Sequence, residues 1–223
     1  MNDKIDYRSQ TLDAYKTSTR AIEYQKYNSR NWTWGRFITW LEQRIVRQEL
    51  KAYEWRNGDC LLDIPCGTGI LGPTIKGFPF DVTASDISCE MMNLAKSEYT
   101  QKYPLQFIQS DITDTSFEKN SYPCIITLGF FHRVPEEIKE STLKELHRIS
   151  SNVVIISFSA DSFFQRAKRR ILALLYGKKI SAPCPESIER MKNRVKCHGF
   201  KVVRMRYVFP LFSSDVLVVL EKC

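Results

Sequence analysis

Short apolar runs alternate with amphipathic stretches along most of this chain, and the alternation predicts an α/β fold. Near-continuous apolar runs are typical of parallel strands that helices cover on both faces. The predicted strands span residues 60–63, 81–86, 105–110, 123–128 and 152–158. Residues 135–148 show the clearest helical periodicity and begin with a proline and two acids, which favour a helix N-terminus. The pattern indicates a doubly wound sheet with a ligand crevice at the carboxyl ends of its strands.

The two ends of the chain depart from this alternation. Near the C-terminus, the sequence predicts a helix over about 186–196 that stops at Gly199, then strands over 200–208 and 215–221. Residues 1–56 precede the first strand and predict helices. This N-terminal arm is dense in aromatic residues, namely Tyr24, Tyr27, Trp32, Trp34, Phe37 and Trp40.

The first strand runs into the sequence Asp-Ile-Pro-Cys-Gly-Thr-Gly-Ile-Leu-Gly at residues 63–72. Gly67 and Gly69 can adopt backbone angles closed to other residues and leave room for a ligand beside the main chain. With Gly72 they also match G-x-G-x-x-G, the pattern of dinucleotide sites. Asp63, however, would repel a pyrophosphate and suits a ligand that carries an ammonium group and hydroxyls. S-adenosylmethionine is such a ligand.

Residues 63–69 resemble the first motif of class I S-adenosylmethionine-dependent methyltransferases, in the Asp-x-Pro-Cys-Gly-Thr-Gly form of bacterial small-molecule and glycan-linked enzymes. Pro65 stands where the motif usually has glycine. The resemblance covers residues 59–223 at fold level. It implies a Rossmann-like, mostly parallel sheet with a C-terminal antiparallel hairpin, formed by residues 57–223, and a helical lid formed by residues 1–56. Packing of the arm's aromatic residues on the core is an equally supported interpretation.

The resemblance also implies the cofactor contacts. Asp86 lies 17 residues past Gly69, close to where a Rossmann-like fold places an acid on the ribose hydroxyls. Asp111 is assigned to the adenine amine, whereas Asp114 favours a turn or cap. The full set of predicted cofactor residues is Asp63, Pro65, Cys66, Gly67, Gly69, Asp86, Ile87, Met91, Asp111, Ile112, Leu128, Gly129, Tyr27 and Arg36.

Two predicted catalytic residues, His132 and Arg133, follow the fourth strand. Methyl transfer is an in-line displacement, so the protein must align the nucleophile and, where needed, remove its proton. His132 is either that base, since an unperturbed histidine has a pKa of about 6.5, or a residue that shapes the cofactor pocket. Arg133 either orients an anionic substrate or closes the crevice. His147 and His198 are assigned to helix ends.

Composition adds bounds on cell location and chemistry. The chain has 223 residues, 43% of them hydrophobic and 26% charged, which suits one soluble α/β domain with an added piece. It contains no apolar run of 18 residues and begins with a polar, acidic sequence, so we expect a cytoplasmic protein. Its seven cysteines form no C-x-x-C pair, and no metal site is indicated.

The net charge of +8 is concentrated in one part of the chain. Residues 162–206 carry 13 Lys and Arg against two Glu, which indicates an anionic partner. Within this part, a basic amphipathic helical insertion is predicted over about 161–184. It suits a second lid, a site for phosphate-bearing glycans or lipids, or a peripheral membrane contact through residues 162–180. An ordinary helix with a solvated basic face is the alternative.

The sequence thus predicts an enzyme that transfers a methyl group from S-adenosylmethionine to an oxygen or nitrogen atom of a small-molecule, glycan or lipid acceptor, with an anionic acceptor favoured. Methylation of RNA or protein is the alternative, although no Asn-Pro-Pro-Tyr-like tetrapeptide follows the fourth strand. A non-catalytic scaffold and a nicotinamide oxidoreductase are less favoured, because Asp63, Asp86 and the loop glycines suit the first interpretation. The acceptor and the oligomeric state stay open.

Overall fold

A computed structural model describes residues 33–99, 105–161, 184–210 and 212–223 of this chain. The predicted contacts of Tyr24, Tyr27 and Trp32, and nearly all of the basic insertion, lie outside these residues. The elements, in chain order, are α3 (Trp34–Leu50), β1 (Asp59–Asp63), α4 (Gly72–Ile75), β2 (Phe80–Asp86), α5 (Cys89–Ala95), β3 (Leu105–Gln109), β4 (Tyr122–Thr127), η2 (Phe131–Arg133), α6 (Glu136–Ile149), β5 (Ser150–Ser159), α8 (Ile188–Cys197), β6 (Phe200–Tyr207) and β7 (Asp215–Lys222).

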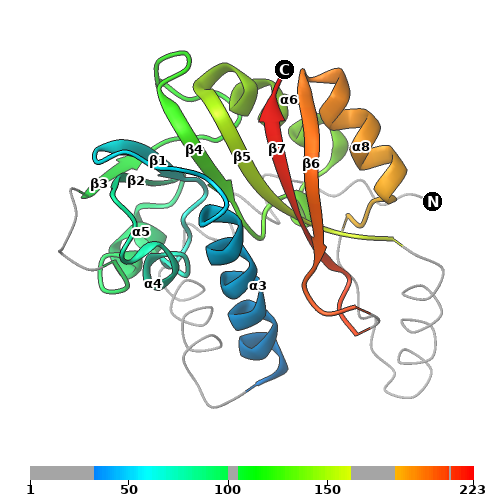
Figure 1. Ribbon diagram of the computed structural model, residues 1–223, viewed down its shortest axis with the longest axis horizontal. Helices are drawn as coiled ribbons and strands as arrows, with labels where there is room; N and C mark the ends of the chain where they lie inside the picture. Colours follow the sequence, from blue (N-terminus) through cyan, green and yellow to red (C-terminus); the bar gives the residue numbers. More distant parts are fainter. Residues whose placement is uncertain (1–32, 100–104, 162–183, 211) are drawn as a thin grey trace.

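In the described part of the chain, the strands form one sheet in the order β3-β2-β1-β4-β5-β7-β6 (Figure 1). The neighbouring pairs from β3 to β5 are parallel, whereas β7 runs antiparallel to β5 and β6. This arrangement confirms the predicted Rossmann-like sheet with its C-terminal hairpin. The chain steps from β1 to β3 on one side and from β4 to β5 on the other. The switch point, where ligands bind in such sheets, therefore lies at the ends of β1 and β4.

Both faces of the sheet are covered by helices. Val154 and Ile156 of β5 lie in one hydrophobic core together with apolar residues of α6 and α8. Val153 and Ile155 lie in the other core with apolar residues of α3, α4 and α5. Successive residues of a strand point to opposite faces, so an uninterrupted apolar run in the sequence corresponds to burial on both sides.

The helix after the glycine loop is short. α4 spans four residues, with Pro73 in its first turn and Gly77, at φ +89°, just beyond its end. A Cβ on Gly72 would lie 2.6 Å from the Glu98 carbonyl oxygen. The third glycine of G-x-G-x-x-G is therefore explained by close packing between α4 and the chain beyond α5.

α3 is the described part of the predicted N-terminal arm. Its C-terminal half is held by the buried Glu49, which pairs with Arg204 and Arg206 of β6. Near its start, Trp34 is 54% exposed, yet its ring contacts Phe209 between β6 and β7. The arm's described aromatic residues are therefore neither fully buried nor free of the domain.

Candidate active site

The glycines at the switch point leave open space beside the backbone. Gly67, after β1, and Gly129, after β4, have φ angles of +53° and +68°. A Cβ on either residue would meet no atom within 4 Å. Gly69 differs, because a Cβ there would lie 2.9 Å from the backbone of Ala95. A ligand can therefore approach the main chain at Gly67 and Gly129, whereas Gly69 serves packing.

A cavity of about 210 Å³ borders these two glycines. α3 covers one side of it through Ile38, Thr39 and Glu42. The other lining residues are Asp63, Pro65, Cys66, Gly67, Thr68, Ile70, Leu71, Leu128, Gly129, His132, Arg133, Ser157 and Asp215. The structure thus brings the predicted residues that follow β1 and β4 to one cavity and adds residues from α3, β5 and β7.

Asp63, the last residue of β1, supplies a buried carboxyl group to this cavity. It is 3% exposed and accepts a hydrogen bond from the Tyr99 hydroxyl. Burial raises the pKa of Asp63 to about 7, more than the Tyr99 hydrogen bond lowers it. A nearby cation would favour the ionised form, so Asp63 suits the ammonium group of a ligand. Tyr99 was not among the predicted site residues.

Asp86, at the end of β2, ties the glycine loop to the next strand. One of its carboxylate oxygens accepts from the N–H of Gly67 at 2.8 Å, and the other from the N–H of Ser88 at 2.9 Å. Burial raises its pKa, and these hydrogen bonds oppose the shift. Asp86 therefore holds the loop in place in addition to its predicted contact with a ribose.

The predicted adenine contacts lie outside the cavity lining, around the ends of β2 and β3. The Gln109 side chain donates to the carbonyl oxygen of Ile87 at 2.9 Å, which joins the two strand ends. Asp111 accepts from the N–H and the hydroxyl of Thr113 at 2.8 and 2.7 Å. Asp114 donates its N–H to the Asp111 carbonyl oxygen, as in a turn.

Three further predicted cofactor residues differ in exposure. Met91 and Ile112 are 5% exposed and are core residues. Arg36 is exposed in the first turn of α3 and is absent from the cavity lining. The assigned cofactor contacts of these three residues stay predictions.

His132 lies in η2 with its side chain engaged by its neighbour. The Arg133 guanidinium donates through Nε to His132 Nε2 at 3.3 Å. Burial, with the charges of Arg133 and Lys139, lowers the pKa of His132 to about 4. The imidazole is then neutral at physiological pH, and its Nε2 lone pair already accepts a hydrogen bond. Of the two predicted functions of His132, this geometry favours the one that shapes the pocket.

The cavity residues that were not predicted from the sequence include three that bear on its chemistry: Glu42, Ser157 and Asp215. Burial and the Asp215 charge raise the pKa of Glu42 to about 7, while a hydrogen bond from Ser157 and the charge of Arg133 oppose the shift. Burial also raises the pKa of Asp215. The available signal was an acid at position 42, one helical turn after the apolar Ile38. On the inner stripe of an amphipathic helix, such an acid is unusual.

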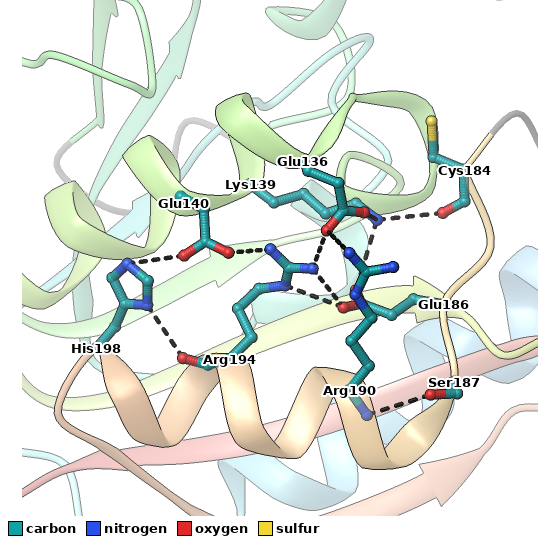
Figure 2. A network of polar contacts seen from close by, with 9 residues as sticks. All are labelled: Glu136, Lys139, Glu140, Cys184, Glu186, Ser187, Arg190, Arg194 and His198. Atoms are coloured by element: carbon teal, nitrogen blue, oxygen red, sulfur yellow. Dashed lines mark hydrogen bonds and ion pairs between the residues drawn. The ribbon is translucent and has the colours of Figure 1, made fainter. Parts of the chain in front are cut away.

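A network of charged side chains joins α6 to α8 near η2 (Figure 2). Arg194 of α8 is 5% exposed at its side chain and pairs with Glu136 and Glu140 of α6 and with Glu186. The contact between Arg194 and Glu186 measures 2.6 Å. A buried guanidinium of this kind is stable only while its partners remain.

The same network reaches the backbone of the site. Lys139 of α6, whose side chain is 1% exposed, contacts Glu186 at 3.5 Å and the carbonyl oxygen of Cys184 at 3.3 Å. The N–H of Cys184 in turn donates to the carbonyl oxygen of His132 at 3.0 Å. The helix pair and the loop that carries His132 are therefore joined by an unbroken chain of polar contacts.

Comparison with known proteins adds a family match over part of the chain. Residues 61–152 match the model of a methyltransferase domain. The chain is 28% identical over 130 residues to demethylmenaquinone methyltransferase of Staphylococcus epidermidis, covering 56% of this chain and 51% of that protein. It is 25% identical over 121 residues to chloroplastic magnesium protoporphyrin IX methyltransferase of Arabidopsis thaliana, covering 54% and 39%. The chain thus spans about half, or less, of the length of these relatives.

A solved structure resembles the chain over nearly its whole length. Magnesium protoporphyrin IX methyltransferase from Synechocystis PCC 6803 with bound S-adenosylhomocysteine superposes with a TM-score of 0.79 at 17% identity, covering 97% of this chain and 100% of that chain. The same enzyme with bound S-adenosylmethionine gives 0.76. The chain therefore has the Rossmann-like fold of S-adenosylmethionine-dependent methyltransferases, and its residues 61–152 match the methyltransferase domain in sequence.

Proposed function

We propose that this chain is an enzyme that binds S-adenosylmethionine at the cavity and transfers its methyl group to a small-molecule acceptor. The observation that carries the proposal is the pairing of open backbone at Gly67 and Gly129 with a cavity lined by the carboxyl groups of Glu42, Asp63 and Asp215. S-adenosylmethionine carries a positive sulfonium and an ammonium group, and both are attracted to carboxylates.

Each strand end would hold one part of this cofactor. Asp63 would bind the ammonium group, Asp86 the ribose hydroxyls and Asp111 the adenine amine. The bound cofactor supplies an electrophilic methyl group. The chain then has to exclude water and to orient the acceptor, and Ile38 of α3 with Leu128 after β4 provides apolar cavity wall for both tasks.

The nature of the acceptor is a separate part of the proposal. Two relatives are named for demethylmenaquinone and magnesium protoporphyrin IX, which supports a small-molecule acceptor. The positive charge of residues 162–206 supports an anionic acceptor only weakly. Three of its arginines, Arg194, Arg204 and Arg206, already pair with glutamates of the fold. The carboxyl groups of Glu42 and Asp215 favour a neutral or cationic acceptor.

The alternative functions receive less support. A nicotinamide cofactor would bring its pyrophosphate toward the carboxyl group of Asp63, which disfavours an oxidoreductase. Methylation of RNA or protein is supported only by the basic residues 162–206. Most of the basic insertion within this segment lies outside the described residues. Among the helices described, none is long and apolar enough to cross a bilayer.

Calorimetric titration of the purified protein with S-adenosylmethionine, S-adenosylhomocysteine and NADH tests the proposed function. We expect the first two to bind with micromolar dissociation constants and NADH not to bind. Binding of NADH alone would overturn the proposal in favour of an oxidoreductase. Binding of none of the three would remove the cofactor assignment altogether.

A further inference from the structure

Four polar side chains of the cavity lining come from elements other than β1 and its glycine loop: Glu42 of α3, Arg133 of η2, Ser157 of β5 and Asp215 of β7. We call these four residues the polar wall. In the sheet order β1-β4-β5-β7, β7 lies three strands from β1, which corresponds to about 14 Å at the usual strand spacing. Asp215 opens an antiparallel strand, so it lies at the edge where the parallel strands end. Asp215 thus faces a different part of the cavity from Asp63.

The backbone fixes the orientation of one hydroxyl in the polar wall. The N–H of Gly129 donates to Ser157 Oγ at 2.7 Å. Ser157 also acts on Glu42, since its hydroxyl lowers the pKa of the Glu42 carboxyl group. Glu42 therefore shares the cavity with a hydroxyl whose position is set by the loop that lies beside the open space at Gly129.

The charges around Glu42 come from several elements. Arg133 on η2 is attracted to both Glu42 and Asp215, whereas Asp215 repels Glu42. His132, next to Arg133, is neutral because its pKa is lowered to about 4. Burial and Asp215 together raise the pKa of Glu42 to about 7. A carboxyl group in these surroundings exchanges protons readily near neutral pH.

We propose that Glu42 removes the proton of the acceptor, and that the acceptor is a neutral or cationic amine or hydroxyl rather than a carboxylate. In the reaction, the nucleophilic nitrogen or oxygen attacks the methyl carbon, the bond from sulfur to methyl breaks, and the electron pair of that bond stays on sulfur. The proton of the nucleophile passes to the Glu42 carboxylate and then to solvent. This inference rests on the proposed function and assigns the base and the acceptor class.

A carboxylate acceptor fits the polar wall poorly for two reasons. It would meet Glu42 and Asp215 against a single opposing charge from Arg133, and it has no proton for Glu42 to accept. Compared with Glu42, His132 is the weaker base, because Arg133 already donates a hydrogen bond to its Nε2.

Matched probes of one ring size test the inference. Benzylamine, benzyl alcohol and benzoate share one ring and differ in the group that they offer to the polar wall. Each is titrated by calorimetry into the protein saturated with S-adenosylhomocysteine, for wild type, Glu42→Gln and the control Glu54→Gln. Glu54 is exposed and lies outside the cavity. Any probe that is methylated is also followed from pH 5 to pH 9.

We expect benzylamine or benzyl alcohol to bind, with affinity at least tenfold weaker in Glu42→Gln and unchanged in Glu54→Gln, and benzoate not to bind wild type. For a methylated probe, kcat should rise with pH to a plateau above about 7, and Glu42→Gln should lose at least tenfold in kcat together with this rise.

The inference is overturned when benzoate binds as tightly as the other two probes. It is equally overturned when Glu42→Gln leaves the affinity for all three probes unchanged. The same holds when none of the three probes binds detectably. Because S-adenosylhomocysteine binding is measured first in every variant, failure of the cofactor assignment is recognised separately from failure of this inference.

Discussion

At the scale of single residues, the carboxyl groups of the cavity set the properties of the site. Asp63 and Glu42 both have pKa values raised to about 7 by burial. A carboxyl group whose pKa is higher in the folded protein than in the unfolded chain favours unfolding once the pH exceeds its unfolded pKa. Asp63 and Glu42 therefore lower the free energy of unfolding near neutral pH. The same two groups can bind cations and exchange protons.

Replacement of Glu42 should reveal this reduction. The folded protein binds more protons at Glu42 than the unfolded chain between about pH 4.5 and 7, so the free energy of unfolding falls as the pH rises through this window. Glu42→Gln removes the effect and should raise the melting temperature at pH 8, with little change at pH 5. Thermal melts at both pH values check this. An equal shift at both values, or a shift also in Glu54→Gln, would contradict the assignment.

Asp86 combines two tasks at one position. Asp86→Ala removes the acceptors for the N–H groups of Gly67 and Ser88 as well as the predicted ribose contact. We expect S-adenosylmethionine binding to weaken by about 1–3 kcal/mol, the usual effect of losing buried hydrogen bonds to a charged group. Calorimetry measures the change, and Asp81→Ala, at the opposite end of β2, is the control. Unchanged affinity in Asp86→Ala would remove Asp86 from the site.

At the scale of elements, the packing of α4 against the chain beyond α5 decides the shape of the glycine loop. Gly72 and Gly69 allow this close approach, whereas Gly67 borders open space. The glycines of one short motif therefore do different things: Gly67 provides access for a ligand, and the other two allow helix packing.

Alanine at each glycine should separate these two functions. Gly72→Ala brings a Cβ to 2.6 Å from the Glu98 carbonyl oxygen, so we expect a loss of about 1–3 kcal/mol in the free energy of unfolding, as for overpacking. Gly67→Ala meets no atom within 4 Å and is strained only by its φ of +53°, so it should reduce stability less while it weakens cofactor binding. Urea unfolding with calorimetry measures both effects. A Gly67→Ala protein less stable than Gly72→Ala would contradict this division.

At the scale of the whole molecule, the charged network between α6 and α8 connects the outer helices to the cavity. Lys139 and Arg194 are buried cations that depend on Glu186, which is also buried. Through Cys184 and the carbonyl oxygen of His132, the position of η2 depends on the same contacts. The loop that carries His132 beside the cavity is thereby held in place by contacts that lead to α6 and α8.

Breaking this network should affect stability far more than removing an exposed charge. Arg194→Met leaves the Glu186 carboxylate with a single cationic partner, and we expect a loss of about 3–5 kcal/mol. Arg190, whose side chain is 64% exposed, also contacts Glu136, and Arg190→Met should change stability by less than about 1 kcal/mol. Chemical unfolding of both variants checks the contrast. Similar losses in the two would show that burial does not decide the strength of these pairs.

The sequence by itself determined the sheet and the glycine loops, because both depend on local patterns. Apolar runs such as 152–158 predict strands buried on two faces, and β5 at Ser150–Ser159 confirms this. The spacing from Asp63 to Gly69 predicts the turn after β1. The packing function of Gly72 could not be predicted, since it depends on Glu98, which lies 26 positions further along the chain.

Only the tertiary structure decided how the cavity is completed. Glu42, Ser157 and Asp215 come from three elements far apart in the sequence, and nothing local marks Ser157 or Asp215 as site residues. The state of His132 also depends on the fold, since burial and the neighbouring Arg133 lower its pKa. Proton affinity is set by surroundings that the chain acquires when it folds. Short-range patterns therefore predict where a ligand binds, and tertiary contacts decide which group exchanges the proton.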